Sequence, residues 1–376
     1  MSESSLKPDT PAIEAGEGQA ARKRGKLRIF LGYAAGVGKT YSMLEEAQRL
    51  KKEGVDVVIG YFEPHARRDT IAKTQGLEQI PRKLISYRRA SFEEMDTEGI
   101  LQRSPQVCVV DEFAHTNVPG SEHGKRYEDV DILLDAGIDI LTTLNVQHLE
   151  SLNDQVWQVT GVRVRETIPD WVVERADEIV MVDVPPRALI HRLERGVVYS
   201  QDKAHRALEN FFTETNLTAL RELALRQTAH QVEDTLGRLT DHRSSAPVNP
   251  NSPLGRVMIQ LNAVPQSAML LRRGKRLANY LDTDCLAVYV ARDEKWSDLS
   301  PEQRDVLEKQ MNFAKNMRIG VEILIGKDIA ETLTNYARQQ QVTQLIILRG
   351  MPDANRIVSK ARDMVVTVVS ERKRAQ

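Results

Sequence analysis

The sequence predicts an α/β protein made of two domains, each with a parallel β-sheet covered by helices. Three observations support this prediction. Short apolar runs alternate with amphipathic stretches of helix length from residue 26 onward, which is the pattern of strands joined by helical crossovers. A stretch rich in Pro, Ser and Asn at 241–254 interrupts the alternation, and a second series of strands and helices follows it. A glycine-rich turn also lies directly between the first strand and the first helix.

The first domain is expected over 26–240. It follows a leader at 1–25 whose Ser, Pro, Gly, Ala and charged residues predict disorder. Apolar positions three and four residues apart predict a helical extension at 203–240. Helices are expected at 39–53 and 91–103, among others, and strands are expected at 26–31, 55–61, 84–87, 107–111, 138–144 and 178–182.

The stretch 241–254 is the predicted linker, and the second, smaller α/β domain is expected over 255–376. Its strands are expected near 256–262, 284–291, 320–325, 344–349 and 364–369.

Composition excludes several classes of protein. The chain of 376 residues is 41% hydrophobic and has 52 basic and 53 acidic side chains, so its near-neutral charge argues against a nucleic-acid partner. No apolar run approaches the length of about 18 residues that a membrane span needs, and the N-terminus has no apolar signal core. Cys108 and Cys285 are too far apart to suggest a metal site or a disulfide framework. We therefore expect a cytoplasmic location.

The glycine-rich turn has the features of a phosphate-binding loop. Glycines allow the backbone N–H groups to surround phosphate oxygens, and the helix that follows directs its positive dipole end at the same anion. Lys39 is expected to reach the β- and γ-phosphates and Thr40 to bind Mg²⁺. The strict pattern has glycine where Tyr33 stands, with Gly32 one residue early. The residues expected at ATP are Gly36, Val37, Gly38, Lys39, Thr40 and Tyr41. The first domain is therefore predicted to be a P-loop NTPase-type sheet.

An acidic pair at the end of a buried strand completes the predicted site. Four apolar residues at 107–110 precede Asp111 and Glu112, as expected of a central parallel strand whose carboxyl end faces a nucleotide. Asp111 is expected to hold the Mg²⁺, and Glu112 either to polarise a water for attack on the γ-phosphate or to sense that phosphate.

Other strand ends offer further candidates, each with an alternative. Asn145 or Gln147 either orients the attacking water or caps a helix that begins near His148. The segment 113–117 is a candidate switch, although its His115 is equally compatible with simple packing. After the second strand, charged side chains either approach the phosphates or belong to a solvated loop; they are Glu63, His65, Arg67 and Arg68.

Four stretches of the sequence resemble the N-terminal cytoplasmic region of the KdpD family of osmosensitive potassium sensor kinases: 36–41, 110–117, 144–151 and 216–226. The resemblance runs from about residue 25 to 376. It implies a P-loop domain of the KdpD type followed by a domain like the universal stress proteins. In that family, four transmembrane helices, a linker and a histidine kinase core come next. No phosphoacceptor histidine motif or ATP-lid glycine box is found in this sequence, so we expect that this chain does not autophosphorylate by itself. It is then expected to be either a truncated sensor or a stand-alone regulatory homologue.

The resemblance also implies cofactors and partners. ATP and Mg²⁺ are the expected cofactors, and the expected partner is the histidine kinase core and membrane region of such a sensor, in the same chain or in another. A homodimer is a further possibility. In the second domain the family's nucleotide motifs are incomplete, because 348–359 has a single glycine and 262–264 lacks the serines of the cyclic di-AMP motif. A packing or interaction role is therefore expected there. The basic stretch 271–276 either meets an acidic partner or forms a solvated helix face.

Three functions follow from the sequence. The leading one is an ATP-binding regulatory module of a potassium- or turgor-responsive two-component system, with at most slow ATP hydrolysis. The second is a small-molecule kinase that uses the same loop, with Glu112 as its base. The third is an interaction scaffold that does not use its phosphate loop.

Overall fold

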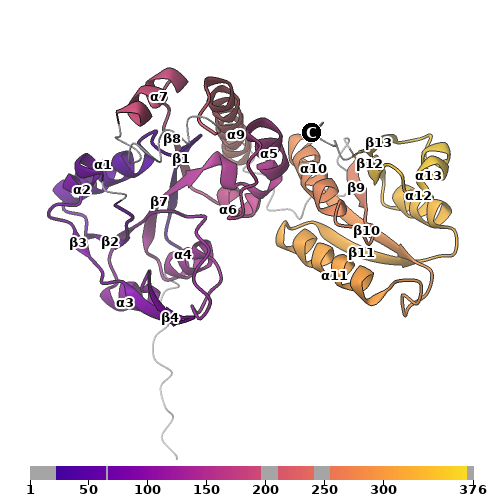
Figure 1. The fold of residues 1–376 in the computed structure, drawn as a ribbon, viewed down its shortest axis with the longest axis horizontal. Helices are drawn as coiled ribbons and strands as arrows, with labels where there is room; N and C mark the ends of the chain where they lie inside the picture. Colours follow the sequence, from indigo (N-terminus) through magenta and orange to yellow (C-terminus); the bar gives the residue numbers. More distant parts are fainter. Residues whose placement is uncertain (1–22, 65–66, 196–210, 241–254, 371–376) are drawn as a thin grey trace, which may run out of the picture.

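The computed structural model describes residues 23–64, 67–195, 211–240 and 255–370, with the side chains of 230–240 left out. The predicted linker at 241–254 and most of the predicted leader lie outside the described residues, as does the beginning of the helical extension. Two parallel sheets are present, one before and one after this linker, so the predicted α/β class is confirmed (Figure 1).

The first sheet has six parallel strands in the order β3-β2-β6-β7-β1-β8. Strand β1 (Leu27–Gly32) lies between β7 (Asp139–Asn145) and the edge strand β8 (Glu178–Met181). Strand β7 separates β1 from β6 (Val107–Val110), and the remaining strands are β2 (Val57–Tyr61) and β3 (Glu78–Gln79). The loops that follow β1, β6 and β7 therefore meet at one edge of the sheet.

Helices cover both faces of this sheet. Helix α1 (Lys39–Lys52) buries Met43, Leu44 and Ala47 against one face, where they meet Phe30 and Val109. Helices α4 (Arg126–Asp135), α5 (Asn153–Thr160) and α9 (Glu214–Thr240) pack on the other face. Short helices complete the domain; they are α2 (Arg68–Ala72), α3 (Thr97–Arg103), α6 (Asp170–Glu174), α7 (Pro186–Glu194) and the 3₁₀ turns η1 (Val146–His148) and η2 (Glu150–Leu152).

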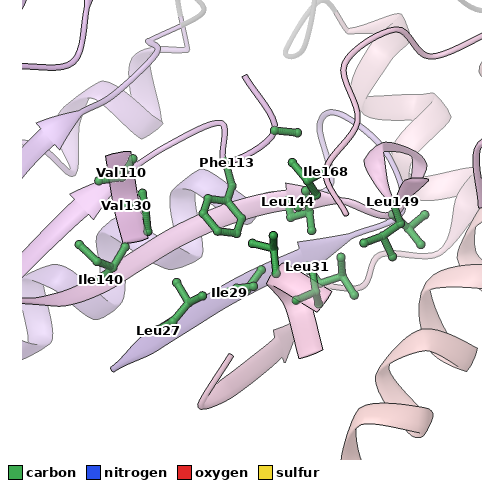
Figure 2. Close-up of a cluster of buried hydrophobic side chains, with 14 of the residues drawn as sticks. Leu27, Ile29, Leu31, Val110, Phe113, Val130, Ile140, Leu144, Leu149 and Ile168 are labelled. Atoms are coloured by element: carbon green, nitrogen blue, oxygen red, sulfur yellow. The ribbon is translucent and has the colours of Figure 1, made fainter. Parts of the chain in front are cut away.

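The core on the α4 face includes a residue of the predicted switch segment. Figure 2 shows Phe113 lying among Ile29, Val110 and Leu144, over the strands β1 and β7. Phe113 is fully buried, so its burial anchors the chain immediately after Glu112.

The region 83–103 corrects two expectations. The predicted strand at 84–87 does not join the parallel sheet: β4 (Lys83–Tyr87) pairs antiparallel with β5 (Ala90–Glu94). The helix predicted over 91–103 is wrong in its first part, because α3 begins only at Thr97, with Asp96 as its N-cap. The tight turn at Arg88 and Arg89, both with positive φ, brings 90–94 back along β4 and takes these residues into a hairpin.

The end of the predicted leader belongs to the folded domain. Arg24 forms ion pairs with Asp131 and Asp135 of α4, and the N–H of Gly25 donates to the carbonyl of Leu134 at 2.8 Å. A Cβ at Gly25 would lie 2.0 Å from the carbonyl oxygen of Ile138, so only glycine allows this close approach.

The second sheet has five parallel strands in the order β11-β10-β9-β12-β13. The strands are β9 (Arg256–Gln260), β10 (Cys285–Ala291), β11 (Gly320–Ile325), β12 (Val342–Leu348) and β13 (Val365–Val369). Helices α10 (Ser267–Tyr280) and α11 (Pro301–Asn316) cover one face, and α12 (Ile329–Gln339) and α13 (Ala354–Lys360) cover the other. In the described part of the chain, no helix combines the length and the apolar character needed to cross a membrane.

Candidate functional site

The glycine-rich turn forms a loop between β1 and α1. Gly36 and Gly38 have φ angles of 89° and 110°, a left-handed backbone that glycine adopts without strain. Gly32 also needs to be glycine, because a Cβ there would lie 2.6 Å from the Cγ2 of Val37 and 2.9 Å from the Cδ of Lys39. This close contact explains why glycine stands one position early in the motif. Tyr33 is instead buried, and its hydroxyl donates to the carbonyl of Val184 at 2.7 Å.

Lys39 is the buried cation of the site. Its ammonium group donates to the carbonyl of Ala34 at 3.2 Å, within the loop itself. Burial lowers the pKa of Lys39 to about 8, and the nearby carboxylate of Asp111 opposes this shift. A phosphate group would supply the counter-charge that this desolvated ammonium needs.

Asp111 is the buried anion of the site. The hydroxyl of Thr40 donates to its two carboxylate oxygens, at 3.2 and 3.3 Å, and the hydroxyl of Thr143 on β7 donates to Oδ1. Burial raises the pKa of Asp111, and the hydrogen bond from Thr143 opposes the rise. The predicted Mg²⁺ residues Thr40 and Asp111 are therefore adjacent, as a shared metal would require.

Glu112 adopts a backbone conformation that is unusual for a residue with a side chain. Its φ is 56°, and its N–H donates to the Oγ1 of Thr143 at 3.2 Å. A left-handed residue other than glycine costs about 1–2 kcal/mol. The result is a carboxylate that remains 37% exposed at the pocket, next to the buried Asp111.

Arg126 supports this acidic pair from behind, and sequence reasoning missed it. Its guanidinium is fully buried, donates to the carbonyl of Asp111 and to Oε2 of Glu94, both at 3.2 Å, and lies 4.0 Å from Oε2 of Glu112. It also stacks 3.6 Å over the ring of Tyr61. Arg126 therefore fixes the backbone that carries Asp111 and Glu112.

These residues surround a pocket of about 240 Å³ at the carboxyl edge of the sheet. Six of the nine residues predicted at ATP line it, and three do not. Val37 is buried in the core, Gly38 is the N-cap of α1, and Tyr41 lies on the outer side of α1 with the ammonium of Lys73 over its ring. The full lining comprises Ala35, Gly36, Lys39, Thr40, Arg67, Asp111, Glu112, Phe113, Ala114, His115, Thr143, Leu144, Asn145, His148 and Glu166.

Asn145 faces the pocket at the end of β7. It precedes the 3₁₀ turn η1, but its side chain makes no capping hydrogen bond to that turn. Within the described residues its buried Oδ1 has no hydrogen-bond partner. The structure therefore disfavours helix capping as the role of Asn145. Its Oδ1 lies at the pocket wall instead. Gln147 does not line the pocket.

The remaining candidates separate into two groups. Arg67 and His115 line the pocket, and the Nε2 of His115 lies 3.1 Å from Oε1 of the buried Glu94. Glu63 instead accepts from the hydroxyl of Tyr61, and Arg68 begins α2. His65 lies outside the described residues.

The corresponding edge of the second sheet is organised differently. The loop after β9 closes on the first turn of α10, where the hydroxyl of Ser267 donates to the carbonyl of Asn262 at 2.9 Å. The amide of Gln310 on α11 donates to the carbonyl of Val264 in the same loop. Arg272 and Arg276 of the basic stretch 271–276 pair with Glu150 and Asp154 of the first domain, so this stretch is not a solvated helix face.

Comparisons with known proteins identify the family of this chain. Residues 23–232 match the family described as "Osmosensitive K+ channel His kinase sensor domain". The chain belongs to this family. It is 49% identical over 269 residues to a putative sensor protein KdpD of Synechocystis, covering 72% of this chain and 71% of that protein.

Longer relatives are the sensor proteins KdpD of Clostridium acetobutylicum and Escherichia coli, each 41% identical. The alignments cover 87% and 95% of this chain but only 36% and 39% of those proteins. Among solved structures, a universal stress family protein from Burkholderia pseudomallei aligns over 32% of this chain and 98% of its own, with 18% identity and a TM-score of 0.26.

Proposed function

We propose that the first domain binds ATP together with Mg²⁺, and that the chain is an ATP-controlled sensory module of a potassium- or turgor-responsive two-component sensor. The observation that carries this proposal is the arrangement of Lys39, Thr40 and Asp111 around one pocket, behind a loop whose glycines are left-handed. Membership of the sensor-domain family supports the sensory part of the proposal.

Each group has a role that follows from its position. The N–H groups of the loop and the N-terminus of α1 bind phosphate oxygens, and Lys39 adds a positive charge that burial makes effective. Thr40 and Asp111 would hold Mg²⁺, which neutralises phosphate charge when bound. Within the described residues, no group of three or more His, Cys, Asp and Glu side chains is placed to hold a metal alone, so the phosphates would complete the coordination.

Glu112 is the proposed acid–base residue. Its carboxylate is partly exposed at the pocket, while its backbone is fixed by Thr143 and Arg126. Arg126 is itself fully buried and bound to Glu94, so it is not free to move toward a reacting phosphate. Arg126 is therefore not proposed as an arginine finger, and we expect at most slow hydrolysis. The histidine kinase core and membrane region of a KdpD-type sensor, in the same chain or another, remain the proposed partners.

Calorimetric titration of ATP, with and without Mg²⁺, tests the proposal in the wild type and in Lys39→Ala. Micromolar binding that needs Mg²⁺ and is lost in Lys39→Ala is expected. Lys309→Ala is the matched control, because Lys309 is an exposed lysine of the second domain that pairs with Asp305 on its own helix. Absence of binding to the wild type would overturn the proposal.

A further inference from the structure

We propose that a nucleotide in the first domain controls how the second domain docks, through the segment 145–154, which lines the pocket at one end and binds α10 at the other. This inference rests on the proposed ATP binding and adds the route and the receiver of its signal. Figure 1 shows the two domains meeting where α10 lies beside α5.

The domain contact is made of ion pairs that are largely removed from water. The Nε of Arg272 lies 2.7 Å from Oε1 of Glu150, and the Nη1 of Arg276 lies 2.7 Å from Oδ1 of Asp154. The side chains of Glu150 and Asp154 are only 10% and 8% exposed. Breaking such a pair leaves a desolvated charge without its partner, which is strongly unfavourable. The contact is therefore sensitive to small displacements of Glu150 and Asp154.

The same segment begins in the wall of the pocket. Asn145, the last residue of β7, lines the pocket together with His148, and Glu150 follows two residues later. The two 3₁₀ turns η1 and η2, joined by the fully buried Leu149, connect Asn145 to Asn153, the first residue of α5. No flexible connection therefore separates the residues that face a γ-phosphate from those that bind α10.

A second stretch, 166–170, runs beside the first and is hydrogen-bonded to it. Glu166 lines the pocket and accepts from the N–H of Thr116, in the segment that follows Glu112. The N–H of Ile168 donates to the carbonyl of His148 at 2.8 Å. At the interface end, Asp170 accepts from the N–H of Ser151 at 3.0 Å and from its hydroxyl. A displacement at the pocket therefore moves both stretches together.

An aromatic residue completes the interface beside this second stretch. Trp171 follows Asp170, and its indole N–H donates to the carbonyl of Asn316 at 2.8 Å. The guanidinium of Arg318 lies 4.1 Å over its ring. Asn316 and Arg318 belong to the second domain, whereas Trp171 belongs to the first, where it also contacts Tyr127 and Arg175. Its fluorescence should therefore change when the contact with the second domain changes.

The first test is reciprocity, since two coupled sites must affect each other equally. Arg273 also lies 3.8 Å from Asp154, so the interface variant is Arg272→Ala/Arg273→Ala/Arg276→Ala. It should change the Kd for ATP·Mg²⁺ by about fivefold or more, in either direction. The control Arg338→Ala/Arg356→Ala removes two paired arginines of the second domain, from the exposed pairs with Asp363 and Asp328, and should leave the Kd unchanged. An unchanged Kd in the interface variant would overturn the coupling while leaving ATP binding intact.

The second test keeps all three interface arginines in place and so decides the question even if the interface variant does not fold. In Trp157→Phe/Trp296→Phe, Trp171 is the sole tryptophan of the chain. Saturating ATP·Mg²⁺ should shift its emission, and the same protein with Lys39→Ala should show no shift. Trp171 emission that does not change when ATP·Mg²⁺ binds would overturn the inference. If the wild type binds no ATP, this inference and the proposed function both fail.

Discussion

The two sheets of this chain are built alike but end in different loops. Both are parallel, both are covered by helices on each face, and in both the first strand lies inside the sheet. After β1 the chain forms a glycine loop around a pocket, whereas after β9 the loop is closed by Ser267 and Gln310. The comparison teaches that the sheet supplies only the edge, and that the residues following each strand decide whether that edge receives a ligand.

The largest expected effect comes from removing the acid at this edge. Asp111→Asn should weaken ATP·Mg²⁺ binding by about 100-fold, because hydrogen bonds to charged groups contribute about 1.5–3 kcal/mol and a metal contact is lost as well. Calorimetric titration measures this. Asp293, which follows β10 in the second sheet, provides the control Asp293→Asn, with no expected change. Equal losses in the two variants would contradict the comparison.

Each domain carries one buried cysteine, so ligand protection can be measured in each domain separately. Burial raises the pKa of both Cys108 and Cys285 to about 12, and neither thiol should react until its domain opens. At ATP concentrations about 50 times the Kd, labelling of Cys108 in Cys285→Ala should slow by about 50-fold.

In Cys108→Ala, ATP·Mg²⁺ should slow the labelling of Cys285 by at most about fivefold, which is the factor expected from coupling between the two domains. Thiol-labelling kinetics with and without ATP·Mg²⁺ measure both rates. Equal protection of the two thiols would mean that the chain opens as one unit.

The glycines provide a third comparison, with a smaller effect. Gly38 and Gly350 both have positive φ, and a Cβ on either would meet no atom within 4 Å. Alanine at either position should therefore destabilise its domain by a similar amount, about 1–2 kcal/mol. Gly38→Ala should also weaken ATP binding by about tenfold, which Gly350→Ala should not do. Thermal unfolding of the two variants measures the cost of the backbone strain, and titration with ATP measures the loss of the binding site.

The smallest expected effect is the pH dependence due to Lys39. Because its folded pKa is about 8, below the ordinary lysine value, the free site loses its positive charge above this pH. If bound phosphate keeps Lys39 protonated, affinity should fall about threefold from pH 7.5 to pH 8.5. Stability without ATP should rise over pH 8–10, because the unfolded state then binds more protons than the folded state. Lys39→Met should remove this rise in stability. If the rise persists in Lys39→Met, a titratable group other than Lys39 causes it.

Much of this fold was predictable from the sequence because strand length and helix periodicity are local signals. Eleven strands were expected, and ten of them are present in the two parallel sheets, within a few residues of their predicted ends. The eleventh, at 84–87, belongs to the hairpin. The hairpin β4–β5 was not predictable, since the pairing of Ala90–Glu94 depends on a left-handed turn at two arginines that sequence patterns do not mark.

The candidate site was predictable where its residues follow strands. Lys39, Asp111 and Asn145 meet because the carboxyl ends of parallel strands share one edge. Arg126 comes 15 residues after Asp111, at the start of a helix, and reaches the site only because α4 packs back on the sheet. Nothing in its local sequence distinguishes it from an exposed arginine. That ATP occupies the pocket stays a prediction.

The left-handed backbone of Glu112 has a consequence for how sequences of this kind diverge. At this position stability and chemistry favour different residues, because glycine would relieve the strain but remove the carboxylate. A lineage that no longer uses the pocket gains stability by replacing Glu112, and selection for folding alone would favour that change. In a related sequence that keeps both loop glycines, Gly36 and Gly38, an acid at the position of Glu112 therefore indicates that the pocket is still in use.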